Sequence, residues 1–280
     1  MIDGISFMTQ NEDEPDQSNP DTAEFFFPGR GASALLVHGL SGTPFEMRFL
    51  GERLAAAGLR VLGVRLAGHA STPEDLAATA HPHWYESVVE GFERLLAFGD
   101  PNVVVGLSMG SLLAARLAAD QRDAVAGVVM LAPAFFLPTP TRLALRLMRP
   151  ARNFRDKIFF RKSSGSDIHD AAARERHPGT RLMPLGAAMS LLELSDQTRL
   201  RLPEVSQPAL VIHSRQDHTC PYDLNADFVM SRLGSASKRL IALDESYHVI
   251  TVDSEKERVA VETTEFILGL RHLAATRASG

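Results

Sequence analysis

The sequence has little cysteine, a single tryptophan and no long apolar run. Among its 280 residues there is one cysteine, Cys220, which excludes an internal disulfide. No Cys/His framework typical of zinc sites is present, so we expect no bound metal. The longest mostly apolar run, residues 124–137, is too short to span a bilayer and contains Pro133. With 45% hydrophobic residues, the chain can still bury a sizeable core.

The chain also lacks a basic excess. Its formal net charge is −5, so no overall positive field exists to hold nucleic acid, and we expect none bound. The expected partner is a small, weakly charged molecule. Residues 1–21 lack the basic start and apolar stretch of a secretion signal. We therefore expect a soluble, cytoplasmic protein.

Short apolar runs recur along the chain, each followed by Gly, Pro, Ser or Asp. Runs that are apolar on both faces predict the covered strands of a parallel sheet. Helical patterns lie between them, and residues 43–58 are the clearest, with Thr43 and Glu46 forming a predicted capping box and Gly58 ending the helix. This alternation predicts an α/β fold with a doubly wound, mostly parallel sheet. The predicted strands lie in residues 34–37, 60–66, 102–107, 127–132, 209–214 and 238–246.

One interval breaks this alternation. Between Pro133 and Pro208 no convincing strand is visible, and helical stretches are separated by prolines. Because so long a structureless loop is improbable in a compact domain, we predict a helical cap inserted at residues 135–206. Residues 25–134 and 207–280 would form the core, and residues 1–24 an acidic, partly mobile N-terminal segment.

Ser108 lies between Gly106 and Gly110, where a predicted strand runs directly into a helical pattern. The glycines give room for a sharp turn that holds the serine hydroxyl above the sheet edge. The start of a helix also favours a developing oxyanion through its free N–H groups. We predict that Ser108 is a nucleophile; a serine that only caps the helix is the alternative.

A serine nucleophile needs a base and a group that orients the base, each from another strand end. Asp217 follows one predicted strand and His248 follows the next, which gives the order Ser, acid, His used by such folds. His213 is expected to point into the sheet layers instead. The other competitors for the acid and base are His218, Asp223, Asp244 and Asp253.

Two backbone N–H groups are expected to bind the oxyanion. They belong to Leu40, in the glycine-bearing loop after the strand at 34–37, and to Met109, the residue after Ser108. His38 and His69 are expected to fix their loops by hydrogen bonds rather than to take part in the reaction.

Five separated motifs together resemble the α/β-hydrolase superfamily, and within it the small bacterial carboxylesterases and monoacylglycerol lipases. They are LLVHGLSGTP, VRLAGHASTPEDL, VVGLSMGS, HSRQDHTCP and SYHVITVDSEKE, and the resemblance covers residues 34 to about 270. It implies an α/β-hydrolase fold, an acyl-serine mechanism with the triad Ser108, Asp217 and His248, and no cofactor. Leu40 stands where many relatives have an aromatic residue.

The predicted cap is rich in apolar side chains, which fits a pocket for an acyl chain. We therefore expect short to medium acyl esters or monoacylglycerols as substrates. The same triad can also open amides, carbamates, thioesters or carbon–carbon bonds or transfer the acyl group, and the fold can serve as a ligand sensor. Candidate acyl-pocket residues are Phe135, Phe136, Met183, Met189 and Val249.

A basic run lies inside the predicted cap. Residues 142–162 contain eight basic side chains and one acid, Asp156. Such a segment could rest weakly on an anionic membrane surface, or it could be a solvated face that balances the acidic remainder. The basic residues are Arg142, Arg146, Arg149, Arg152, Arg155, Lys157, Arg161 and Lys162.

Overall fold

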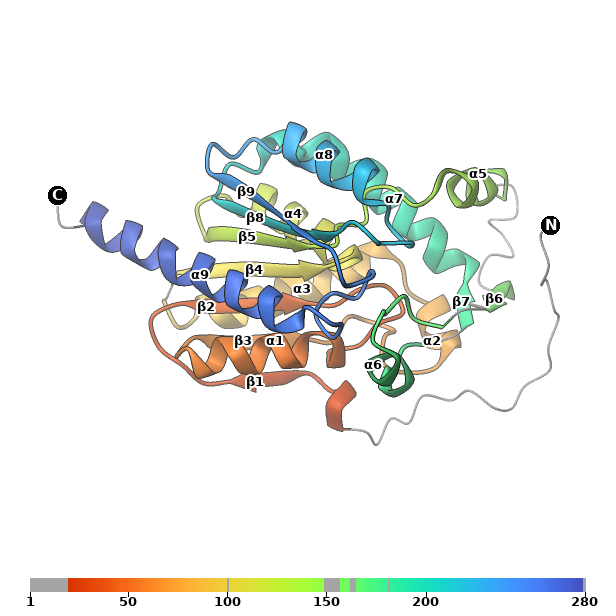
Figure 1. Cartoon of the computed structure of the whole chain (residues 1–280), viewed down its shortest axis with the longest axis horizontal. Coiled ribbons are helices and arrows are strands. Elements are labelled where there is room, and N and C mark those ends of the chain that lie inside the picture. The colour runs from red at the N-terminus through yellow and green to blue at the C-terminus, as the bar shows by residue number, and fades with distance from the viewer. Residues whose placement is uncertain (1–19, 100, 149–156, 162–164, 181, 279–280) are drawn as a thin grey trace.

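The computed structural model describes residues 20–99, 101–148, 157–161, 165–180 and 182–278. In this part of the chain, seven strands form one sheet with the order β1-β3-β2-β4-β5-β8-β9 (Figure 1). The edge strand β1 (Phe25–Phe27) is antiparallel to β3, and the other neighbours are parallel. The predicted mostly parallel sheet is therefore confirmed.

All six predicted strands are present, and helices cover both faces of the sheet. Every side chain of β2, β4 and β8 is buried, which explains why these strands are apolar at successive positions instead of alternating. The edge strand β1 was not predicted, because three residues are too few to show a period. The six strands are β2 (Ser33–Val37), β3 (Arg60–Val64), β4 (Asn102–Leu107), β5 (Val125–Leu131), β8 (Ala209–Ser214) and β9 (Lys238–Leu243).

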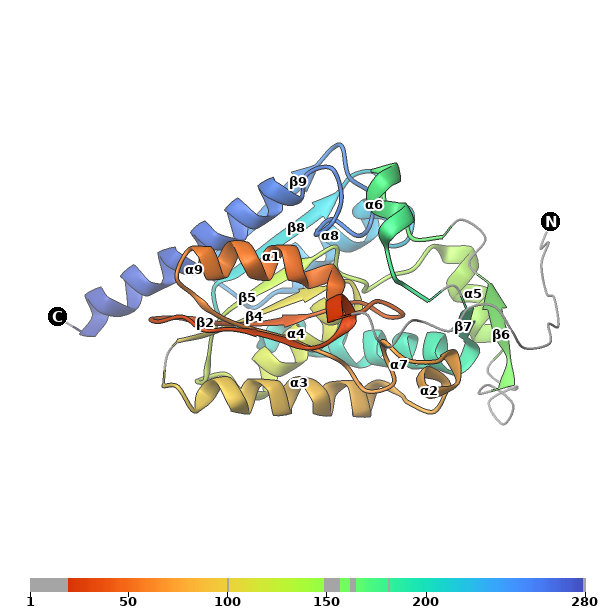
Figure 2. The ribbon, with the colours of Figure 1, turned by 90° about the horizontal axis from the view of Figure 1, so that it is seen from below.

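The helices form two layers. Figure 2 shows α1 (Phe45–Ala56) and α9 (Lys256–Ala278) on one side of the sheet and α3 (His81–Leu96) and α4 (Met109–Asp120) on the other. Each layer has its own buried cluster, one around α1 and β2 and the other around α3, α4 and α7. The remaining helices of the core are α2 (Pro73–Ala77) and α8 (Tyr222–Arg232).

The β5–β8 connection comprises residues 132–208, and its described part lies at one end of the sheet (Figure 1). It contains α5 (Thr139–Leu147), α6 (Ala171–Arg176) and α7 (Leu185–Arg201). The prediction that it has no strand is wrong, because β6 (Phe159–Arg161) and β7 (Leu182–Pro184) pair as a small antiparallel sheet. Two three-residue strands separated by about 20 residues leave no periodic pattern in a sequence.

The capping box predicted for α1 is also wrong. The helix begins at Phe45, and Thr43 Oγ1 accepts only the Phe45 N–H, at 3.3 Å. The Glu46 carboxylate is buried and turned towards the preceding loop, where it accepts the N–H of Gly39 at 3.2 Å. A tertiary contact has therefore replaced the local one that the pattern predicted.

The predicted N-terminal segment lies mostly outside the described residues, which begin with a short 3-10 turn at Pro20–Thr22. Among the helices that are described, none combines the length and apolar character needed to cross a membrane.

Candidate active site

Ser108 stands on a sharp turn between β4 and α4. Its backbone has φ +56° and ψ −117°, a conformation rare for any residue but glycine. The flanking glycines are required by contact: a Cβ at Gly106 would lie 2.0 Å from the carbonyl oxygen of Gly110, and one at Gly110 would lie 2.2 Å from that of Val37. The Gly-x-Ser-x-Gly pattern therefore packs three backbones together and presents the serine side chain at the strand end.

Ser108, His248 and Asp217 form one hydrogen-bonded chain. Ser108 Oγ lies 2.8 Å from His248 Nε2, and His248 Nδ1 lies 2.7 Å from Asp217 Oδ2. Because the carboxylate can only accept, Nδ1 carries the hydrogen and Nε2 is free to accept the serine proton. The three residues come from the ends of β4, β8 and β9, which are far apart in the sequence.

Asp217 is held by more donors than the sequence indicated. Its Oδ1 accepts the backbone N–H groups of Thr219 and Cys220, at 2.9 and 2.6 Å. Its Oδ2 accepts, besides His248, the Nε2–H of His213 at 2.9 Å. His213 is fully buried in β8, and its contact with Asp217 is one that the sequence did not predict. Its position four residues before Asp217, at the end of β8, was the signal available in the sequence.

The electrostatics of the site follow from this pairing. Burial opposes ionisation of Asp217, but the charge of His248 and the hydrogen bonds from both histidines outweigh it and hold the pKa of Asp217 well below its ordinary range. Burial alone would lower the pKa of His248. The nearby charge of Asp217 has the larger effect, so the pKa of His248 lies above its ordinary value of 6.5.

The competing residues lie outside the triad. Asp223 and Asp244 are exposed, and Asp244 pairs with Arg215. His218 is exposed and lies 3.0 Å from the Asp167 carboxylate. Asp253 is buried, and its two oxygens accept the N–H groups of His169, Asp170, Tyr247 and Ser254.

Asp167, which the sequence analysis did not single out, connects the β5–β8 connection to two loops of the site. Its carboxylate accepts the N–H groups of His218 and Thr219, at 3.0 and 3.1 Å. Its carbonyl oxygen accepts those of His248 and Val249, at 3.0 and 3.1 Å. One residue therefore braces the loop of Asp217 and the loop of His248 together.

The loop after β2 lies directly beside Ser108. A Cβ at Gly39 would be 3.3 Å from the Ser108 Cβ, and Leu40 lines the same cavity as Ser108. Met109 is the first residue of α4, so its N–H has no acceptor within the helix. His38 fixes the loop as expected, because its Nδ1 donates to the Gly39 carbonyl and its Nε2 accepts the Leu66 N–H. His69 contacts the carbonyl of Ala67 in its own loop, at 3.0 Å.

The hydroxyl of Ser108 opens into a cavity of about 490 Å³, within the range of small-molecule sites. Its wall combines polar and apolar side chains. Besides Ser108 and His248, the polar lining residues are Ser41, Glu46, Thr141, Arg161, Ser166, Asp167, His177, His218 and Thr219. The apolar lining residues are Leu40, Leu107, Ala134, Leu137, Leu145, Phe160, Met183, Ala188, Leu191 and Val249.

Of the five candidate pocket residues, Met183 and Val249 line this cavity, and the other three do not. Phe135 is buried and Phe136 half-buried, with both rings against Phe228. On α7 the cavity side is formed by Ala188 and Leu191, and Met189 is turned by about 100° from Ala188. The sequence could not show which face of α7 meets the cavity.

No group of three or more His, Cys, Asp or Glu side chains placed to hold a metal ion occurs within the described ranges. The triad geometry supplies a nucleophile, a proton acceptor and a charged orienting group from side chains alone.

A family model described as serine aminopeptidase, S33 (Hydrolase_4) matches residues 30–255. The chain belongs to this family. It is a serine hydrolase with the α/β-hydrolase fold, as the sequence motifs predicted.

Three relatives support this assignment. The chain is 33% identical over 245 residues to a thermostable monoacylglycerol lipase of Bacillus sp. (strain H-257), covering 87% of this chain and 94% of the relative. It is 26% identical over 244 residues to a carboxylesterase of Bacillus subtilis (strain 168), covering 87% and 95%. A solved structure from work on the metagenome-derived lipolytic enzymes LipS and LipT superposes with a TM-score of 0.81 at 31% identity, covering 89% and 98%.

Proposed function

We propose that this serine hydrolase cleaves carboxylic esters through an acyl-serine intermediate on Ser108. The observation that carries this proposal is the continuous hydrogen-bonded chain from Ser108 through His248 to Asp217. The Ser108 hydroxyl at its end faces a largely apolar cavity. The resemblance to a monoacylglycerol lipase and a carboxylesterase supports the same reaction.

In this mechanism His248 Nε2 takes the Ser108 proton as the oxygen attacks the ester carbonyl. The N–H groups of Leu40 and Met109 bind the oxyanion that forms. His248 then protonates the leaving alcohol, and water repeats the sequence to release the acid. Asp217 keeps the hydrogen on Nδ1 of His248 and stabilises the imidazolium.

The substrate we propose is a monoacylglycerol or another short to medium acyl ester. The apolar wall of the cavity suits an acyl chain, and the polar part near Ser166 and Thr219 suits an alcohol with free hydroxyls. The β5–β8 connection contributes most of this apolar wall, so we also propose that residues 135–206 act as a cap over the core residues 25–134 and 207–280.

A chain-length series tests this proposal. Monoacylglycerols and p-nitrophenyl esters of two to sixteen carbons are compared by kcat/KM, with aminoacyl p-nitroanilides as the arm for peptide-like amides. We expect a maximum at about eight or more carbons with a monoacylglycerol, because each buried methylene contributes about 0.8 kcal/mol. A maximum at two to four carbons would identify a general esterase, and preferred cleavage of the anilides would contradict the ester proposal.

We also propose that α5 rests weakly on anionic membranes. Its Thr141 and Leu145 face the cavity, while Leu143 and Leu147 are 57% and 71% exposed beside Arg142 and Arg146. Arg142 lies over the Phe136 ring and Arg146 lies 3.9 Å from Asp196, so their charges are only partly engaged. The basic residues Arg149, Arg152, Arg155 and Lys162 lie outside the described residues.

Vesicle sedimentation measures this contact. At low salt we expect the protein to sediment with anionic vesicles. We expect it to stay in the supernatant in about 0.5 M salt, and the Leu143→Ser/Leu147→Ser variant to stay in the supernatant even at low salt. Leu224→Ser, which changes an exposed leucine of α8, is the matched control. Absence of pelleting by the unaltered protein at low salt would exclude the membrane contact.

A further inference from the structure

Glu46 is a buried carboxylate beside the loop that carries Leu40, and it lines the same cavity as Ser108, as does His177. Glu46 is 5% exposed, and its Oε2 accepts the Gly39 N–H at 3.2 Å. Gly39 is the residue between His38 and Leu40 and lies against the side chain of Ser108. The carboxylate therefore fixes the peptide next to the one whose N–H is the proposed oxyanion donor.

The other oxygen of Glu46 is held by a residue of the β5–β8 connection. His177, which follows α6, lies with its Nε2 3.0 Å from Glu46 Oε1. Its Nδ1 accepts the Gly179 N–H at 3.2 Å and lies 2.7 Å from the Ser166 hydroxyl. Since Nδ1 accepts an N–H, the ring hydrogen is on Nε2 and donates to Glu46. The side chains alone of His177 and Glu46 are only 4% and 6% exposed, respectively.

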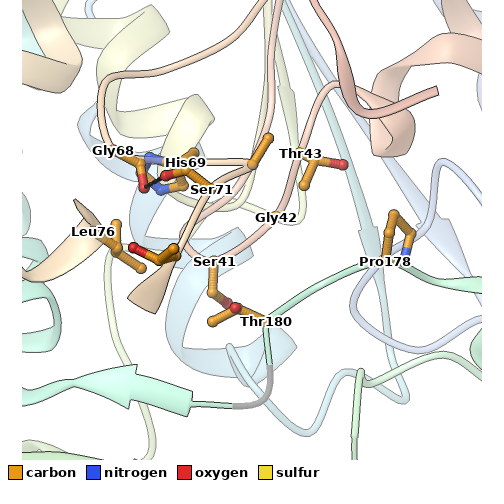
Figure 3. Close-up of a pocket in the computed structure, with 11 residues that line it drawn as sticks. Ser41, Gly42, Thr43, Gly68, His69, Ser71, Leu76, Pro178 and Thr180 are labelled. Carbon is orange, nitrogen blue, oxygen red and sulfur yellow. Dashed lines mark hydrogen bonds between the residues drawn. The ribbon is translucent and has the colours of Figure 1, made fainter. Parts of the chain in front are cut away.

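The same two segments meet at further points. The Thr180 N–H donates to the Ser41 carbonyl at 3.1 Å. A Cβ at Gly42 would lie 2.2 Å from Glu46 Oε2, so the loop closes tightly over the carboxylate. Figure 3 shows Pro178 and Thr180 facing the loop of Ser41, Gly42 and Thr43 across a small pocket. The connection is thus seated on the loop of Leu40 by both side-chain and backbone contacts.

The surroundings keep Glu46 ionised. Burial acts to raise the pKa of this carboxyl, but the hydrogen bonds from His177 and from the Gly39 N–H outweigh burial, so the pKa of Glu46 lies below its ordinary value. A charged acceptor makes a stronger hydrogen bond than a neutral one. The Gly39 peptide is therefore held more firmly than an amide or hydroxyl acceptor would hold it.

We propose that His177 and Glu46 are positioning residues for the oxyanion loop, through which the β5–β8 connection controls the placement of the Leu40 N–H. His177 orients Glu46, Glu46 fixes the Gly39 peptide, and the following peptide presents its N–H to the reacting carbonyl. This inference rests on the proposed function, because it needs Leu40 as an oxyanion donor. It gives the pair a role in transition-state binding in addition to its structural contact.

The test compares His177→Ala with His177→Gln, whose amide N–H can replace Nε2–H. Ser190→Ala is the matched control, because the Ser190 hydroxyl also joins the connection to the core, through the His81 N–H at 2.7 Å, away from Glu46. Each variant is assayed for kcat and KM with an ester and for its inhibition constant with a trifluoromethyl ketone, which forms a tetrahedral oxyanion on the serine. Active sites are counted with a fluorophosphonate probe.

For His177→Ala we expect kcat per active site to fall about tenfold to a hundredfold with little change in KM. A displaced oxyanion donor lowers kcat by about this factor. The affinity for the ketone should fall by the same factor as kcat/KM. His177→Gln should recover most of the loss, and Ser190→Ala should leave both quantities near their starting values.

Unchanged kcat in His177→Ala would overturn the proposal, and so would a loss of kcat without loss of ketone affinity. If His177→Ala does not fold, Glu46→Gln replaces it, with a smaller fall of both quantities expected and no change counting against the inference. Failure of the proposed function is seen separately, as fluorophosphonate labelling that survives Ser108→Ala.

Discussion

Ser108→Ala is expected to lower kcat for p-nitrophenyl butyrate by about 10⁶-fold, the loss typical of removing the serine of a triad. The Ser108 hydroxyl donates to His248 Nε2 over 2.8 Å, and the substitution removes only this hydroxyl. Without it the cavity still binds the ester, but no acyl-enzyme forms. The variant should therefore retain affinity for a substrate analogue and lose labelling by a fluorophosphonate.

A buried serine elsewhere serves as the control. Ser235 is 3% exposed, bonds the Ser237 carbonyl and lies before β9, away from the carboxyl ends of the strands. Ser235→Ala should keep both activity and labelling. Activity of Ser108→Ala near that of the unaltered protein would remove the acyl-serine mechanism altogether.

The second large effect is expected for Asp217→Asn, with kcat falling about 10⁴-fold, as for the corresponding change in serine proteases. The Thr219 and Cys220 N–H groups require an oxygen at the Oδ1 position. The amide NH₂ must then occupy the Oδ2 position, where it faces Nδ1–H of His248 and Nε2–H of His213. His248 is driven to the tautomer with hydrogen on Nε2, which cannot accept the proton of Ser108.

The pH profile of kcat/KM checks the electrostatic part of this explanation. His248 acts only when neutral, so activity falls as pH drops through its pKa, which Asp217 raises above 6.5. The acidic limb of the unaltered protein should therefore have its midpoint above 6.5. In Asp217→Asn burial acts on His248 without the opposing charge, and the midpoint should move to lower pH. An acidic limb that does not move would contradict this pairing.

Much of the fold and of the candidate site was predictable, because both depend on strong local signals. Buried strands must be apolar on both faces, and this pattern was enough to predict six strands from the sequence. Strand ends in a parallel sheet share one edge, so the order of Ser108, Asp217 and His248 was enough to bring them together as candidates.

The rest depended on tertiary contacts with no local pattern. Glu46 matched a capping box, yet a buried peptide N–H and a distant histidine are its actual partners. Asp167 contacts the loop of Asp217 from 51 residues away in the sequence, through the His218 N–H. The cavity lining also depended on the rotation of α7, which apolar composition does not determine.

The bracing by Asp167 has a consequence for protein engineering. Because this residue of the β5–β8 connection also bonds the loops of Asp217 and His248, the segment that shapes the substrate pocket cannot be exchanged as an independent module. A chimera that takes residues 132–208 from another hydrolase inherits a new acyl pocket and new supports for the catalytic loops at once. A graft that retains Asp167 would keep its hydrogen bonds to both of these loops.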